Sequence, residues 1–166
     1  MDHEHFMKKA LEQAQNALDV GEFPVGCVLV HQNRVLATGS RKGTAGQYPN
    51  EIEHAEMMAL RQLADMGIAA TTMGIDLYTT MEPCLMCLGA MLLSGIRKVV
   101  YAYEDVMGGG TRCDLSKMTP LYKNSGITIV PHIMRQESLA LFKTFFNNPE
   151  NSYWKNSLLA QYTLQQ

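Results

Sequence analysis

One histidine and two cysteines in this chain have the residue types and the spacing to hold a metal ion. They lie in two short motifs, His54-Ala55-Glu56 and Pro83-Cys84-Leu85-Met86-Cys87. One imidazole and two thiolates can occupy three corners of a zinc tetrahedron and leave the fourth to water, as in catalytic zinc sites. A structural zinc site would need a further ligand at close spacing, and Cys27 and Cys113 lie far from the pair. We therefore predict one Zn²⁺ held by His54, Cys84 and Cys87.

Glu56 lies two residues after the histidine, where its carboxylate could move protons on and off a bound water. Zinc lowers the pKa of its bound water toward neutrality, which makes that water a nucleophile. The expected substrate carries an exocyclic amine on a ring carbon beside a ring nitrogen, and Glu56 would protonate first that nitrogen and then the departing ammonia. Alone, Glu56 would be read as a carboxylate that stabilises a helix start. The neighbouring ligands favour the catalytic role.

The composition is that of an ordinary soluble globular protein. Of 166 residues, 46% are hydrophobic and 18% charged, which predicts a single domain over residues 1–166 with a helical C-terminal extension at about 135–166. No apolar run approaches the ~20 residues that span a membrane. The first residues lack the basic start and apolar stretch of a signal peptide. Four cysteines, two of them assigned to the metal, make no disulfide framework, so we expect a cytoplasmic protein.

The charge balance bears on the choice of partner. The net charge is −2, from 14 basic and 16 acidic residues, and residues 151–166 contain one lysine. Proteins that bind structured RNA usually present a basic patch or tail, because phosphate contacts supply much of the affinity. The sequence therefore disfavours an RNA partner, unless basic residues gather in three dimensions.

Apolar periodicity predicts helices and strands in alternation. We expect a helix at 6–18, a hairpin of strands 25–30 and 35–38, a loop at 39–50, a helix at 54–63, a strand at 75–80, a helix at 84–93, strands at 97–102 and 127–130, a helix at 136–146 and a terminal helix at about 153–162. This order predicts an α/β fold, with three α/β/α layers around a mixed sheet of about five strands.

Both metal motifs follow an extended segment and open a helix in this prediction. The ligands would then lie at helix N-termini, where the partial positive charge favours thiolate over thiol. The two helices need only pack side by side to close the metal site.

The ordered motifs Pro24-Val25-Gly26, His54-Ala55-Glu56 and Glu82-Pro83-Cys84-Leu85-Met86-Cys87 resemble the cytidine deaminase superfamily. The His-x-Glu…Pro-Cys-x-x-Cys pattern is the signature of its zinc-dependent nucleobase deaminases. Over residues 5–130 the chain is similar to the branch that holds tRNA wobble adenosine deaminases, bacterial guanine deaminases and fungal-type cytosine deaminases. This resemblance implies a cytidine deaminase-like fold, zinc, and a homodimer in which one subunit helps to shape the other's pocket. It also implies base contacts around Val25, Gly26, Ala55 and Pro83.

The chain departs from that branch in two segments. Arg41 stands where members of that branch have an asparagine that binds the base or sugar. Residues 50–53 read Asn-Glu-Ile-Glu in place of Asp-Pro-Thr-Ala. These departures disfavour an ordinary tRNA substrate. The guanidinium of Arg41 suits an anionic or carbonyl-bearing group on the substrate. A solvated loop arginine is an equally good interpretation.

Three further residues are candidates for the substrate pocket: Tyr101, Asp105 and Trp154. Aromatic stacking combined with one carboxylate suits the edge of a guanine-like base. Packing in the core or at a dimer interface explains Trp154 at least as well.

Our first functional hypothesis is a hydrolytic deaminase that releases ammonia from a free nucleobase or nucleoside, with water as co-substrate and guanine-like purines slightly favoured. The alternative is a tRNA wobble adenosine deaminase. A third interpretation is a zinc-containing, non-catalytic binding subunit. Such subunits commonly lose the proton-shuttling glutamate, which is present here as Glu56.

Overall fold

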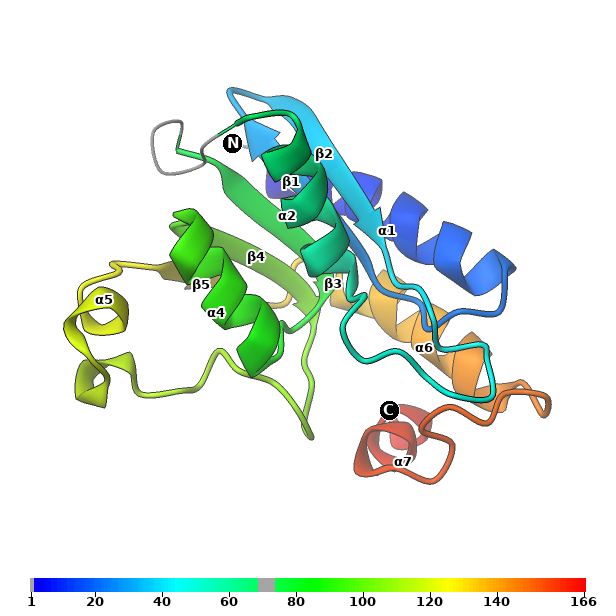
Figure 1. Cartoon of the computed structure of the whole chain (residues 1–166). Coiled ribbons are helices and arrows are strands. Elements are labelled where there is room, and N and C mark those ends of the chain that lie inside the picture. The colour runs from blue at the N-terminus through cyan, green and yellow to red at the C-terminus, as the bar shows by residue number, and fades with distance from the viewer. Residues whose placement is uncertain (1, 69–73) are drawn as a thin grey trace.

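The computed structural model describes residues 2–68 and 74–166 and shows a five-stranded mixed sheet (Figure 1). The strands are β1 (Gly26–His31), β2 (Arg34–Ser40), β3 (Asp76–Met81), β4 (Lys98–Tyr103) and β5 (Thr128–Val130), in the order β2-β1-β3-β4-β5. Strand β1 is antiparallel to β2 and β3, whereas β3, β4 and β5 are parallel. The predicted hairpin and mixed sheet are confirmed.

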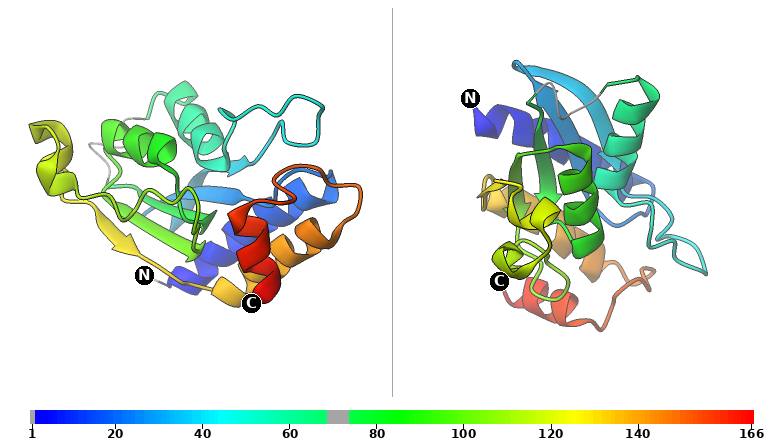
Figure 2. Two further views of the ribbon diagram at one scale, coloured as in Figure 1. Left: turned by 90° about the horizontal axis from the view of Figure 1, so that it is seen from below. Right: turned by 60° about the vertical axis from the view of Figure 1, so that its left-hand side comes forward.

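Helices cover both faces of this sheet (Figure 2). Helix α1 (His3–Asp19) packs on β1, β3 and β4 and also contacts α6 (Arg135–Asn147). Helices α2 (Ala55–Asp65) and α4 (Leu85–Ser94) contact each other on the opposite face. The terminal helix α7 (Leu158–Gln165) packs on α6. The predicted three-layer α/β/α architecture is confirmed, and no helix in the described residues is long and apolar enough to cross a bilayer.

Successive apolar residues of a strand point to opposite faces of the sheet and so supply two separate parts of the core. Val28 and Val30 join the cluster beneath α1, whereas Cys27 and Leu29 of the same strand join the cluster beneath α2 and α4. Successive side chains of a strand point to opposite faces, so a strand that is buried on both faces must be apolar throughout.

Two glycines let helices approach the sheet closely. A Cβ atom on Gly39 of β2 would lie 1.9 Å from the carbonyl oxygen of Ala55, and one on Gly26 of β1 would lie 2.1 Å from that of Ala10. Any larger residue would push α2 or α1 away from the sheet. The contact at Ala55 matters most, because α2 begins directly after His54.

The C-terminal helix begins later than the sequence predicts. Residues 153–157 form turns, and α7 begins at Leu158, where the Ser157 side chain accepts a hydrogen bond from the N–H of Ala160 at 3.1 Å. Trp154 adopts a left-handed backbone conformation with φ of 56°, which a helix does not allow. The predicted start near residue 153 is therefore wrong. Two short elements, η1 (Leu115–Lys117) and α5 (Pro120–Lys123), were not predicted.

Candidate metal centre and pocket

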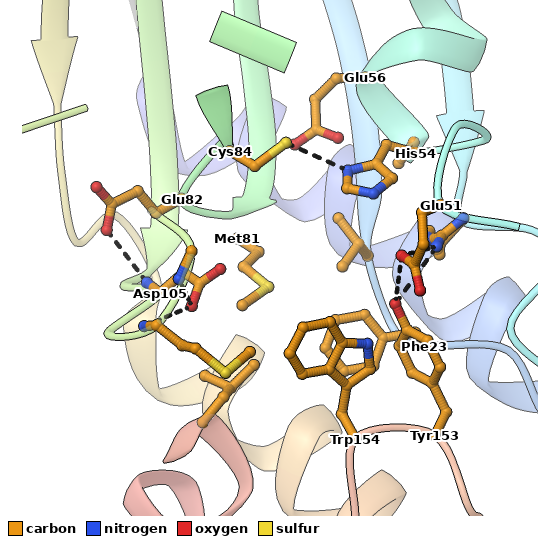
Figure 3. A pocket seen from close by; sticks show the side chains of 16 residues that line it. Phe23, Glu51, His54, Glu56, Met81, Glu82, Cys84, Asp105, Tyr153 and Trp154 are labelled. Atoms are coloured by element: carbon orange, nitrogen blue, oxygen red, sulfur yellow. Dashed lines mark hydrogen bonds and ion pairs between the residues drawn. The ribbon is translucent and has the colours of Figure 1, made fainter. Parts of the chain in front are cut away.

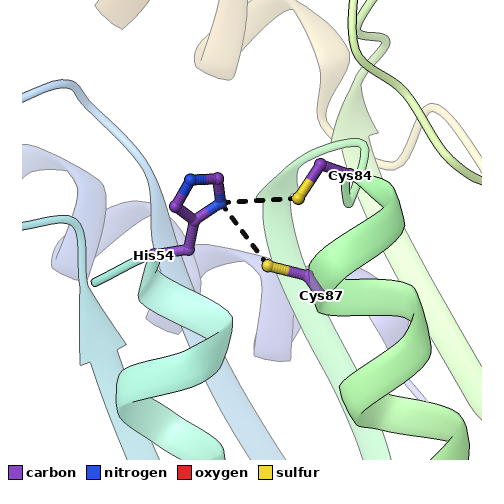
Figure 4. A group of neighbouring side chains, drawn as sticks. All are labelled: His54, Cys84 and Cys87. Carbon is purple, nitrogen blue, oxygen red and sulfur yellow. Dashed lines mark hydrogen bonds between the residues drawn. The ribbon is translucent and has the colours of Figure 1, made fainter. Parts of the chain in front are cut away.

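The starts of two helices bring the three predicted ligands together (Figure 4). His54 is the N-cap of α2, Cys84 is the N-cap of α4, and Cys87 lies in the first turn of α4. The His54 Nδ1 atom lies 3.7 Å from the Cys84 sulfur and 3.5 Å from the Cys87 sulfur, and the three ligand atoms all lie within 4.8 Å of one another. Nitrogen and sulfur ligands of tetrahedral zinc lie roughly 3.5–3.8 Å apart. The donor set and its spacing therefore fit zinc.

The two sulfurs shift each other's pKa in opposite directions. A hydrogen bond from Cys87, joined by the neighbouring imidazole of His54, lowers the pKa of Cys84 to about 4 despite its burial. The same hydrogen bond to Cys84, together with burial and the nearby Glu56 carboxylate, raises the pKa of Cys87. A divalent cation favours the thiolate form of both residues.

Glu56 lies beside the ligands in the first turn of α2 and is buried. The Thr79 hydroxyl donates to its Oε1 atom at 2.8 Å, and the Cys87 sulfur lies 3.6 Å from Oε2. Burial raises the pKa of the Glu56 carboxyl, although the charge of His54 and the hydrogen bond from Thr79 oppose the shift. A carboxyl group with a raised pKa suits proton transfer near neutral pH.

A pocket opens in front of these residues (Figure 3). Five of the substrate-contact candidates line it together with His54, Glu56 and Cys84: Val25, Arg41, Ala55, Asp105 and Trp154. Gly26, Pro83 and Tyr101 are not among the described lining residues.

Those three residues have other neighbours. Gly26 faces α1, and the Pro83 carbonyl accepts a hydrogen bond from the N–H of Gly110 at 2.8 Å. The Tyr101 ring packs against the ring of His132, with 5.8 Å between centroids. Their part in substrate binding, like that of the five lining candidates, stays a prediction.

Arg41 is not a solvated loop residue, because only 2% of its surface is exposed. Its Nη1 atom donates to the carbonyl oxygens of Lys42 at 2.6 Å and Glu53 at 3.0 Å. Its Nη2 atom donates to Glu51 Oε2 at 3.2 Å and lies 3.5 Å from the Tyr153 hydroxyl. The guanidinium therefore joins groups of the protein itself at the edge of the pocket.

Asp105 is positioned by a second buried carboxylate, Glu82, to which the sequence analysis gave no role of its own. Glu82 accepts hydrogen bonds from the N–H of Asp105 at 3.1 Å and from the hydroxyl of Thr111. Asp105 in turn accepts from the N–H groups of Met107 and Gly108, each at 2.9 Å. Burial raises the pKa of the Asp105 carboxyl, which these two hydrogen bonds oppose.

Eight further residues that line the pocket were not predicted as substrate contacts from the sequence: Phe23, Glu51, Met81, Glu82, Met107, Gly108, Tyr153 and Leu159. Three of these had a signal in the sequence, and one of them is Glu82, which opens the second metal motif. Glu51 is a carboxylate three residues before a metal ligand, and Tyr153 precedes the candidate Trp154. The others look like ordinary core or turn residues.

The family match agrees with this geometry. Residues 1–103, which hold all three ligands and Glu56, match the family model described as the cytidine and deoxycytidylate deaminase zinc-binding region. The chain belongs to this deaminase family. It is therefore an enzyme of the zinc-dependent class that hydrolytically deaminates nucleobases or nucleosides, with His54, Cys84 and Cys87 positioned to bind the metal ion.

Relatives of this deaminase include enzymes with different substrates. The tRNA-specific adenosine deaminase 2 of Xenopus laevis is 34% identical over 151 residues, which cover 86% of this chain and 85% of the relative. A solved structure from a study of tRNA:A34 deaminases is 29% identical, with a TM-score of 0.65, and covers 79% of this chain and 99% of that one. The guanine deaminase of Nitrosomonas europaea has a TM-score of 0.69 over 86% of this chain and 83% of its own, but at 22% identity it shows the shared fold alone.

Proposed function

We propose that this deaminase converts adenosine in a tRNA to inosine. The observation that carries the proposal is the similarity to tRNA-specific adenosine deaminase 2, which extends over 86% of the chain and so reaches well beyond the metal motifs. This reverses the order of the two hypotheses drawn from composition. The net charge of −2 and the arginine at position 41 favoured a free base as substrate, whereas the similar proteins favour an RNA substrate.

In this reaction the bond between C6 of adenine and its exocyclic amine is broken, and a bond from C6 to the oxygen of water is formed. His54, Cys84 and Cys87 would hold zinc, which supplies an activated water when bound. Glu56 would accept a proton from the water and deliver it to N1 of the base. It would then carry the second proton to the amine, which leaves as ammonia. The Thr79 hydroxyl fixes one carboxylate oxygen of Glu56, and the other oxygen lies 3.6 Å from the Cys87 sulfur at the metal centre.

A free purine base or nucleoside is the second candidate, and the pocket supports it. Among the described residues that line the pocket, Arg41 is the one arginine or lysine, and it is paired within the protein, whereas Glu51, Glu82 and Asp105 are acidic. Phosphate groups of RNA are held by lysine and arginine. A lining of this charge suits a small neutral heterocycle.

The two candidates are separated by ammonia release from the zinc-loaded protein. The panel holds adenine, guanine, cytosine, their nucleosides, and a tRNA anticodon stem-loop with adenosine at the wobble position. Turnover of the stem-loop that weakens steeply with added salt supports the RNA substrate, because each phosphate contact adds to the salt dependence. Turnover of a free base or nucleoside alone would overturn it in favour of the second candidate. Glu56→Ala is the control and should be inactive with every substrate while it retains zinc.

We also propose that residues 1–166 act as one deaminase domain, in a homodimer and in a reducing cytoplasm. Helices α6 and α7 pack on each other and α6 packs on β4, which supports a single folding unit. None of the four cysteines forms a disulfide, which suits a reducing compartment. Two exposed leucines of α4, Leu85 and Leu93, suit an interface between subunits.

A further inference from the structure

The C-terminal segment contributes one wall of the active-site pocket. Tyr153, Trp154 and Leu159 line the same pocket as His54 and Glu56, although about a hundred residues separate the two groups in the chain. Figure 3 shows the Trp154 indole across the pocket from Glu56 and Cys84. We call residues 153–159 the lid segment.

A polar cluster ties the lid segment to the loop that precedes the metal ligand His54. The Tyr153 hydroxyl donates to Glu51 Oε2 at 2.9 Å, and Arg41 donates to the same carboxylate oxygen at 3.2 Å. Arg41 is anchored in turn by the backbone carbonyls of Lys42 and Glu53. The lid segment is thus connected to the backbone immediately before His54.

The Tyr153 ring is also fixed by an apolar contact. It packs against the Phe23 ring with 5.4 Å between centroids, and Tyr153 as a whole is buried. Tyr153 therefore anchors the lid segment through both its hydroxyl and its ring.

Trp154, the next residue, is less enclosed, and its ring meets the edge of the Tyr153 ring with 5.7 Å between centroids. It is 39% exposed, and its indole N–H makes no hydrogen bond to any residue that the structure describes. Its backbone lies in the left-handed region, with φ of 56°, which is unfavourable for a bulky side chain. The indole therefore lies at the pocket although it is not part of the buried core.

We propose that Trp154 stacks on the heterocycle of the substrate, and that Arg41, Glu51 and Tyr153 are positioning residues that hold the lid segment in place for this contact. Stacking on an aromatic side chain suits any planar base, so Trp154 would contribute affinity for either candidate substrate. The inference rests on the proposed function only in requiring a planar heterocycle in this pocket.

The chain allows a direct binding test, because Trp154 is its one tryptophan. Zinc-loaded Glu56→Ala protein, which should bind without turnover, is titrated with adenosine, guanine and the anticodon stem-loop while indole fluorescence is recorded. Stacking should give saturable quenching, and D-ribose, which cannot stack, should give none. Binding detected by calorimetry with unchanged fluorescence would overturn the stacking role and leave the proposed function intact. Binding of none of the probes would overturn both.

Kinetics of Trp154 variants supply a second readout. Trp154→Ala should raise KM about tenfold with little change in kcat or zinc content, because stacking contributes to binding rather than to proton transfer. Trp154→Phe should restore most of the lost affinity. An unchanged KM in Trp154→Ala, or a raised KM that phenylalanine does not rescue, contradicts the proposal.

The positioning role is tested without any ligand. Tyr153→Phe removes the hydroxyl that joins Glu51, so Trp154 should become more accessible to acrylamide and its emission should shift to longer wavelength. Tyr48→Phe is the matched control, because Tyr48 is exposed and its hydroxyl makes no hydrogen bond among the described residues. Equal quenching of Tyr153→Phe and wild-type protein would show that the cluster does not hold the lid segment.

Discussion

Cys84 and Cys87 differ from Cys27 and Cys113 only in their surroundings. Cys27 is buried in strand β1, where burial raises the pKa of its thiol, and Cys113 is exposed in a turn. Cys84 and Cys87 instead lie together at the start of α4, and the imidazole of His54, at the start of α2, lies within 3.7 Å of both sulfurs. Metal binding at the residue scale therefore depends on a second and third ligand within reach, since a single thiol has little affinity.

Replacement of one ligand should abolish stoichiometric zinc binding. We expect Cys87→Ser to lose at least about a hundredfold in zinc affinity, because a neutral hydroxyl replaces a thiolate. Metal analysis after exhaustive dialysis should find about one zinc per chain in the wild type and far less in the variant. Cys113→Ser, at the exposed cysteine, should retain zinc, and a parallel loss in that control would refute the three-ligand assignment.

At the scale of elements, the metal centre depends on how closely helix α2 approaches strand β2. Gly39 allows this approach, because a Cβ there would overlap the Ala55 carbonyl. The start of α2 carries His54 as its N-cap and Glu56 in its first turn. Any shift of α2 therefore moves a ligand and the candidate proton carrier together.

We expect Gly39→Ala to lower the free energy of unfolding by about 3 kcal/mol, because the new methyl group meets backbone atoms that cannot move independently. Zinc affinity should fall as well. Chemical denaturation and zinc titration measure the two effects. Gly46→Ala is the matched control, since a Cβ at Gly46 meets nothing within 4 Å. Equal stability of the two variants would contradict the close-packing argument.

An ion pair to the buried Glu104 ties the C-terminal helices to the end of strand β4. Glu104 accepts from Arg135 Nε at 2.8 Å and from the Tyr162 hydroxyl at 2.7 Å. Burial opposes ionisation of Glu104, but the hydrogen bonds from Arg135 and Tyr162 outweigh it and lower its pKa from 4.5 to about 2. A carboxyl group with a lowered pKa in the folded state stabilises the fold fully above its unfolded pKa. That stabilisation is lost as the pH falls from 4.5 toward 2.

Arg135→Met should therefore lower the free energy of unfolding at pH 7 by about 2 kcal/mol, because the buried Glu104 carboxylate keeps only the Tyr162 hydroxyl and the half-exposed His132 ring as partners. The variant should also show a shallower loss of stability between pH 4.5 and pH 2 than the wild type. Denaturant titrations across this range measure both effects. Lys143→Met, on the same helix, is the control, because Lys143 makes no ion pair among the described residues. An unchanged pH profile in Arg135→Met would contradict the assigned role of the pair.

At the scale of the whole molecule, helix α4 carries exposed apolar side chains that packing within one chain does not account for. Leu85 is 60% and Leu93 62% exposed, and Met118 at the end of η1 and Leu121 in α5 are also exposed. Leu85, Leu88 and Leu92 line a shallow depression with Met118 and Tyr122. Apolar surface of this kind is typical of subunit interfaces.

We predict that the protein is a dimer in solution, with twice the 18.5 kDa mass of the chain. Leu93→Glu should shift it to the monomer, because a buried, unpaired carboxylate is costly in an apolar interface. Light scattering after size-exclusion chromatography measures the mass. Leu164→Glu, at an exposed leucine of α7, is the control and should remain dimeric. A monomeric wild-type protein would exclude the dimer.

Much of the architecture was predictable, because the strands and helices have strong apolar periodicity. The helices around the metal motifs begin within one residue of their predicted starts, since each motif ends an extended segment and opens an apolar helix. The start of α7 was missed, because Tyr153 and Trp154 have the apolar spacing of a helix but are held in a turn by contacts with Glu51 and Phe23.

The sequence by itself determined the metal centre and the family. His54, Glu56, Cys84 and Cys87 lie in two local motifs at helix starts, where short-range backbone geometry sets the direction of each side chain. Only the tertiary structure decided the far wall of the pocket. Arg41 and Tyr153 lie 112 residues apart, and their contact depends on how the C-terminal segment docks against Phe23. Such docking depends on packing between segments far apart in the chain, which the spacing of neighbouring residues does not predict.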